Sequence, residues 1–98
     1  LPFSHLSHFY PSGCSIYTTY IFRLTDDPEL TRLRWHKLKE AASAAILAQQ
    51  GTISHHHGVG TDHRRYMEQE KGELGVGAIR DVCRSFDPRG ILNPGKLV

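Results

Sequence analysis

One long helical pattern, over residues 27–51, constrains the fold of this chain more than any other feature. Asp27 and Pro28 are typical of a helix start, because aspartate caps the first N–H groups and proline fits the first turn. Apolar residues recur along the segment at intervals of three and four, and Gly51 is typical of the position that follows a helix. The pattern therefore predicts one uninterrupted helix, and the elements before and after it decide the fold class.

Strand patterns lie on both sides of this helix. Residues 13–23 are rich in β-branched and aromatic side chains on both faces, which predicts a strand covered on both sides. Residues 1–11 predict an extended lead-in segment, and residues 52–57 predict a short second strand. A further helix follows, with a break near residues 71–74 where glycines interrupt it. A strand, a helix and a strand in this order predict two parallel strands with a right-handed crossover.

The order of elements predicts an α+β fold with ferredoxin-like β-α-β-α connectivity. Two strands do not make a stable sheet alone, so we expect the sheet to be incomplete within these 98 residues. The chain is then either a C-terminal piece of a larger protein or a chain that associates with its own copy, as a homo-oligomer, through open sheet edges. Its length fits one domain, spanning residues 1–98.

Composition excludes several classes of protein. The chain has 12 Lys and Arg against 10 Asp and Glu, and a net charge of +2 is too small to indicate a nucleic-acid partner. Hydrophobic residues make up 39% of the chain, which argues against disorder at so low a charge. Two cysteines make no disulfide framework and are typical of a reducing compartment, so we expect a cytoplasmic protein.

The strongest local motif is Ser-His-His-His-Gly-Val-Gly at residues 54–60. An imidazole can donate and accept a proton near neutral pH, which is its usual role in catalysis. On a strand, His55 and His57 would share one side and His56 would face the other. Three consecutive histidines followed by a glycine turn favour a catalytic site over a solvated strand end.

A metal site is the alternative for these histidines. His55, His57 and His63 would supply three imidazoles, and Asp62 or Glu68 would supply an oxygen ligand. The chain has neither a spaced cysteine pair nor two histidines one helical turn apart, so no metal is the favoured expectation. A non-catalytic dimeric binding module is the third possibility.

Three other positions are candidates for a site. Tyr17 lies within the first strand pattern, where a packed aromatic is its simplest role; it becomes a catalytic candidate if the histidines lie within hydrogen-bond reach. Gly58 and Gly60 would let a flat ligand approach the backbone closely. Asn93, in an Asn-Pro-Gly-Lys turn, has a side chain that can hydrogen-bond the edge of a ring.

Together, these segments resemble a known family. The resemblance rests on Ser7-His8, Gly13-Cys14-Ser15-Ile16-Tyr17, Ile46-Leu47-Ala48, Ser54 to Gly60, Phe86-Asp87-Pro88 and Asn93 to Leu97, in that order. The chain is similar to the C-terminal segment of FAD-linked oxidases of the vanillyl-alcohol-oxidase type. The triple histidine before Gly-Val-Gly most resembles the alkyldihydroxyacetonephosphate synthases within that superfamily.

The resemblance implies specific roles and partners. Tyr17 matches the catalytic tyrosine of the family, and His55, His56 and His57 match its active-site histidines, which would move protons at the reacting carbon. Asn93 would lie by the flavin. The implied partner is an N-terminal FAD-binding domain outside these residues, so we expect FAD in the full-length protein and not on this piece alone.

Two activities follow from the resemblance. The first is exchange of an acyl for an alkyl group in ether-lipid synthesis, on a lipid-like substrate and without net redox change. The second is FAD-dependent oxidation of a 2-hydroxyacid or alcohol, which the Asn-Pro-Gly-Lys tail favours because it is closer to the dehydrogenase branch.

Overall fold

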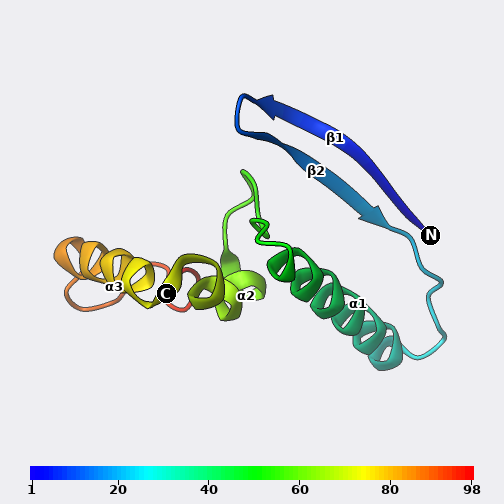
Figure 1. Ribbon diagram of the computed structural model, residues 1–98. Helices are drawn as coiled ribbons and strands as arrows, with labels where there is room; N and C mark the ends of the chain where they lie inside the picture. The colour runs from blue at the N-terminus through cyan, green and yellow to red at the C-terminus, as the bar shows by residue number, and fades with distance from the viewer. The chain divides into compact units, whose positions relative to one another are not determined.

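A computed structural model describes all residues from 1 to 98, which divide into two compact units, Leu1–Lys39 and Glu40–Val98 (Figure 1). Its elements in chain order are β1 (Pro2–Tyr10), β2 (Gly13–Tyr20), α1 (Pro28–Ala48), α2 (Gly60–His63), a 3-10 turn η1 (Arg64–Tyr66) and α3 (Met67–Phe86). The predicted α+β class is confirmed. None of the helices combines the length and apolar character needed to cross a membrane.

The sheet is an antiparallel hairpin of β1 and β2, so the prediction of parallel strands is wrong. Residues 2–10, which the sequence pattern predicts as a lead-in, supply the strand that pairs with β2. Only Pro11 and Ser12 separate the two strands, and a connection this short allows antiparallel pairing alone. The predicted second strand at residues 52–57 is a loop instead.

The register of the hairpin gives it two chemically different faces. A bulge at His8, whose φ is 45°, shifts the pairing from Ser7 opposite Ser15 to Phe9 opposite Cys14. One face therefore carries the opposed pairs Leu6–Ile16 and Phe9–Cys14, and the other carries His5–Tyr17 and Ser7–Ser15. The first face, which we call the apolar face, is mainly apolar but also carries the pair Ser4–Thr18. The second, which we call the polar face, is rich in hydroxyl and imidazole groups and also carries Phe3.

Helix α1 begins and ends where the sequence predicts. The Glu29 N–H donates to Asp27 Oδ1 at 2.8 Å, which confirms the predicted cap. At the other end the Gly51 N–H donates to the Ile46 carbonyl and the Gln50 N–H to the Leu47 carbonyl, both at 2.9 Å, which is a Schellman closure. The left-handed residue is Gln50, at φ 58°, whereas Gly51 is needed because a Cβ there would lie 2.9 Å from Ile46 Cγ2.

The second unit has a small buried core. Leu47, Met67 and Val76 are its buried apolar side chains, and an ion pair of 2.7 Å between Arg65 and Glu40 ties η1 to the end of α1. Gly72, at φ 72° and ψ 164°, interrupts α3 at the predicted break. Between α1 and α2 the chain forms the loop of residues 52–59, which we call the histidine loop.

Large apolar side chains remain exposed in both units. Ile16 on the hairpin is 64% exposed, and Leu74 and Phe86 on α3 are 91% and 84% exposed. Surfaces of this kind are typical of faces that another part of a protein, or a partner, covers. They agree with a sheet of only two strands, which is below the size needed for independent stability.

Candidate active site

Tyr17 lies in the middle of β2, on the polar face of the hairpin. Its ring is opposed by His5 of β1, with ring centroids 5.3 Å apart and planes tilted by 30°. Tyr17 is 46% exposed, so a reactant can reach it from the open side of the sheet. The predicted position on a strand is confirmed, and its neighbour His5 is a residue that the sequence pattern does not point to.

Hydroxyl groups continue the polar face beyond this ring pair. Ser15 donates its hydroxyl to the Ser7 carbonyl at 3.0 Å, and the two Oγ atoms lie 3.1 Å apart. Ser7 Oγ also lies 2.9 Å from Nδ1 of His8, in the bulge. A connected row of hydroxyl and imidazole groups thus lies along the same face as Tyr17, next to its ring pair.

The three histidines of the motif lie in the histidine loop and not on a strand. His55 and His56 stack with centroids 3.9 Å apart and planes 17° from parallel. The predicted alternation, with His56 turned away from its neighbours, is therefore wrong. The cause is local: His56 adopts φ 63° and Gly58 φ 76°, and neither value belongs to an extended strand.

Side chains bond to the backbone of the histidine loop at two points. Ser54 donates its hydroxyl to the Gly58 carbonyl at 2.6 Å and closes the segment that carries the histidines. Glu70 of α3 accepts the Ile53 N–H at 3.1 Å, at the point where a strand partner would otherwise bind. One side-chain donor and one side-chain acceptor thus bond to the backbone of the loop, where a strand would have a sheet ladder.

The charge of Glu70 is stabilised in this position. Burial raises the pKa of its carboxyl, since only 12% of the side chain is exposed. Hydrogen bonds from Lys71 and from the Ile53 N–H, together with the charge of Lys71, act in the opposite direction and leave the pKa below its ordinary value. Glu70 is thus an ionised acceptor at neutral pH, and sequence analysis missed its role.

Gly58, Gly60 and Asn93 are the residues predicted to lie near a flavin. A Cβ placed on Gly58 or Gly60 would meet no atom within 4 Å, so the backbone there is open to close approach. Asn93 adopts φ 47° in the turn near the C-terminus. Asp87 holds that turn by accepting the Leu92 N–H at 2.7 Å, which presents the next residue, Asn93.

The alternative of a metal centre finds no ligand set. No three His, Cys, Asp or Glu side chains gather at a distance suited to a metal ion. Nδ1 of His63, one of the alternative ligands, is buried without a hydrogen-bond partner.

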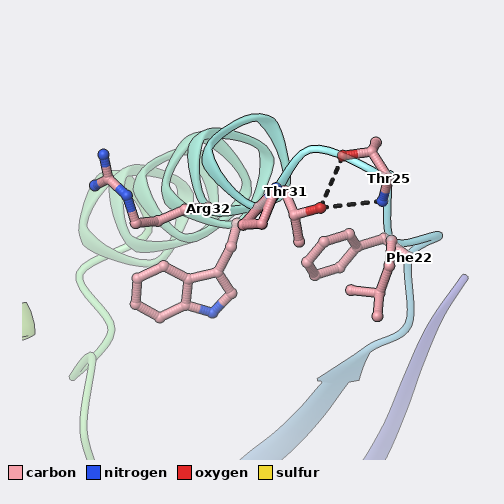
Figure 2. A pocket seen from close by; sticks show the side chains of 7 residues that line it. Phe22, Thr25, Thr31 and Arg32 are labelled. Carbon is pink, nitrogen blue, oxygen red and sulfur yellow. Dashed lines mark hydrogen bonds between the residues drawn. The ribbon is translucent and has the colours of Figure 1, made fainter.

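A separate groove lies where the chain passes from the hairpin into α1. Phe22, Leu24 and Trp35 line it with apolar surface, and it measures about 490 Å³ (Figure 2). Thr25 and Thr31 close one end through a hydroxyl pair 2.9 Å apart and a Thr25 N–H bond of 3.0 Å to Thr31 Oγ1. None of the predicted site residues lines this groove.

The comparisons with known proteins identify the family. Residues 1–97 match the family model described as FAD linked oxidases, C-terminal domain. The chain belongs to this family. The resemblance inferred from Tyr17, the histidine motif and the tail is therefore confirmed, and the family's name implies FAD in its full-length members.

Individual relatives carry different names. The chain is 36% identical over 94 residues to an alkyldihydroxyacetonephosphate synthase of Trypanosoma brucei brucei, covering 96% of this chain and 15% of that protein. It is 30% identical over 95 residues to the synthase of Dictyostelium discoideum, covering 97% and 15%. It is also 33% identical over 73 residues to a probable mitochondrial D-lactate dehydrogenase of Danio rerio, covering 74% and 14%.

These matches also measure how much of a relative the chain represents. It spans about 15% of the length of the two synthases. No solved structure matches it. Within the chain, the three histidines and Gly58 lie in the histidine loop of the second unit and Gly60 begins α2, while Tyr17 belongs to the first unit. The convergence of Tyr17 with the histidines stays a prediction.

Proposed function

We propose that this chain is the C-terminal part of an FAD-dependent enzyme of the alkyldihydroxyacetonephosphate synthase type, which exchanges an acyl for an alkyl group in ether-lipid synthesis. The observation that carries the proposal is the match of nearly the whole chain to two synthases. Tyr17 and the three histidines support it from the sequence, because they are the groups that a proton-transfer mechanism needs.

In this proposal the chain supplies acid–base groups and the wall of the flavin site. Tyr17 and His55, His56 and His57 remove a proton from the exchanging carbon and return it. Gly58 and Gly60 offer open backbone to the flavin, and Asn93 hydrogen-bonds its edge. FAD, when bound through the N-terminal domain, supplies an electron-accepting ring beside these groups.

The apolar face of the hairpin supports an N-terminal domain as the partner. Leu6, Phe9 and Ile16 are between 54% and 72% exposed along one face, whereas the polar face carries Tyr17. A strand pair that is apolar on one side and polar on the other has one side for packing and one for a site. Self-association through the open edges of the hairpin is the competing use of this surface.

An FAD-dependent 2-hydroxyacid oxidoreductase is the second candidate. The match to a D-lactate dehydrogenase over 74% of the chain favours it, as does the Asn-Pro-Gly-Lys tail. The two activities differ in electron flow, because an oxidoreductase reduces its flavin and the exchange reaction has no net redox change.

The deciding experiment uses the purified full-length protein without oxygen. The substrates are an acyl dihydroxyacetone phosphate and a labelled long-chain alcohol. We expect a labelled ether product, and we expect the flavin to keep the absorbance of its oxidised form at the end of turnover. Bleaching of the flavin by D-lactate or another 2-hydroxyacid, with no ether product, would assign the second activity instead. Turnover of neither substrate class would reject both.

A further inference from the structure

We propose that His5 is the positioning residue of Tyr17: its ring supports the phenol on the hairpin and fixes the direction of the hydroxyl. This inference rests on the proposed catalytic role of Tyr17. It adds a residue that lies 12 positions earlier in the chain and on the other strand of the hairpin.

The first support for the proposal is the register. His5 and Tyr17 are directly opposed in the antiparallel ladder, so their side chains leave the sheet on the same face. Cross-strand neighbours of this kind have Cβ atoms about 5 Å apart, which is close enough for two rings to touch along their length.

The second support is the ring geometry. The centroid distance of 5.3 Å lies within the range in which ring pairs attract, and the tilt of 30° leaves a large shared area. A phenol has two side-chain torsions, and contact along one side of the ring restricts both. The hydroxyl at the end of the ring therefore keeps one direction.

The third support is that hydroxyl bonds across the strands bracket the pair. Along the ladder, Ser4 Oγ and Thr18 Oγ1 lie 2.9 Å apart on one side of the pair, on the opposite face of the hairpin. Ser7 Oγ and Ser15 Oγ lie 3.1 Å apart on the other side, on the same face as the ring pair. These bonds resist slippage of the strands by one residue, which would send His5 and Tyr17 to opposite faces. The ring contact is thus a fixed feature of the hairpin.

The fourth support is the size of the adjacent side chains. Ser7 and Ser15, the next pair on the same face, are small and bonded to each other. They give the phenol ring little lateral contact on that side. Phe3, opposite Thr19, is the other large side chain of β1 on this face, and His5 is the one directly opposed to Tyr17.

The test uses the full-length protein with 3-fluorotyrosine at position 17, and three variants. His5→Ala removes the ring, His5→Phe keeps a ring and removes the imidazole nitrogens, and His36→Ala is the matched control. His36 also contacts an aromatic ring, that of Trp35 at 4.7 Å, but lies on α1. Steady-state kinetics and the fluorine resonance of residue 17 are measured for each.

We expect His5→Ala to lower kcat about 10-fold with little change in KM, because a displaced reacting group affects the transition state more than substrate binding. Its fluorine resonance shifts and broadens as the ring contact is lost. His5→Phe restores kcat to within about twofold of the parent and restores a narrow fluorine resonance. His36→Ala leaves kcat and the resonance unchanged.

Two results would overturn the proposal. One is a His5→Ala protein with the kcat and fluorine resonance of the parent. The other is a His5→Phe protein as impaired as His5→Ala, since a ring alone would then not be enough. His5→Gln replaces the alanine variant if that variant does not fold.

The failure of this inference can be told apart from failure of the proposed function. An active Tyr17→Phe protein would remove the catalytic role of Tyr17. The fluorine resonance would still report whether His5 holds the ring in place.

Discussion

The hairpin carries Tyr17 and the histidine loop carries the three candidate histidines, and the two regions hold their side chains by different means. In the hairpin, a regular ladder of backbone hydrogen bonds aims Tyr17, and hydroxyl pairs between the strands maintain the register. In the histidine loop, the backbone has left-handed residues, and Glu70 and Ser54 replace the missing ladder. A ladder distributes the restraint over many bonds between two strands, whereas the backbone of the loop is bonded by individual side chains such as Glu70 and Ser54.

The two regions therefore differ in how strongly the loss of one side chain disturbs them. Removal of one cross-strand hydroxyl leaves the rest of the hairpin ladder in place, so the effect on Tyr17 is small. Removal of Glu70 leaves the Ile53 N–H without its partner and frees the start of the histidine loop. The predictions below follow this difference from the largest expected effect to the smallest.

The largest effect is expected from Tyr17→Phe in the full-length protein. Loss of the hydroxyl removes an acid–base group, so turnover falls about 10²–10⁴-fold while bound FAD, measured by its absorbance, is retained. Tyr20→Phe is the control, because Tyr20 lies on the same strand and opposite face of the hairpin. Equal turnover in the two variants would remove Tyr17 from the chemistry.

The next effect is expected from Glu70→Ala. An unpaired, partly buried N–H costs about 1–3 kcal/mol, so the histidine loop opens more often. Amide hydrogen exchange at Ile53 in the full-length protein measures this as faster exchange, and turnover falls with it. Glu68→Ala, two residues earlier on the same helix and exposed, is the control. An unchanged exchange rate at Ile53 in Glu70→Ala would show that the carboxylate does not hold the loop.

A pH dependence follows from the same carboxylate. The pKa of Glu70 lies below its ordinary value of 4.5, so the unfolded chain binds more protons than the folded chain as the pH falls. The stabilisation is complete above the ordinary value and is lost as the pH falls through the lower folded pKa. We expect the parent to protect the Ile53 amide better than Glu70→Gln at pH 7, and this advantage to disappear in acid. An advantage that persists at the lowest pH would contradict the charge assignment.

The smallest effect is expected from Ser15→Ala in the hairpin. One cross-strand pair contributes about 0.2–1 kcal/mol, and the remaining ladder preserves the register. Hydrogen exchange of the β2 amides therefore accelerates only slightly, and turnover changes little. Thr19→Ala, on the same face of the same strand, is the control. If Ser15→Ala accelerated exchange and lowered turnover as much as Glu70→Ala does, the proposed difference between the two regions would be contradicted.

Much of the fold follows from local patterns, and one strand shows why the rest does not. Strand β2 and helix α1 follow from β-branched side chains and from an Asp-Pro cap. Strand β1 was hidden because the bulge at His8 places Leu6 and Phe9 on the same face at an odd spacing. A bulge breaks the period of two by which a strand is recognised.

The candidate site residues also divide into those that the sequence identifies and those that it does not. The sequence identifies the histidine motif and Tyr17, because residue types alone indicate their chemistry. The stack of His55 on His56 could not be predicted, since it depends on a left-handed residue that is not glycine. Glu70 and His5 were missed because each acts through a contact distant along the chain.

The central claim is that Tyr17 and the histidines act on one reacting atom in the full-length enzyme. A double-mutant cycle of Tyr17→Phe and His57→Ala on kcat tests it most directly. If the two groups act as a unit, the double variant is scarcely slower than the slower single variant. If the loss of kcat in the double variant instead equals the product of the two single losses, the phenol and the imidazole act independently, which would contradict the claim.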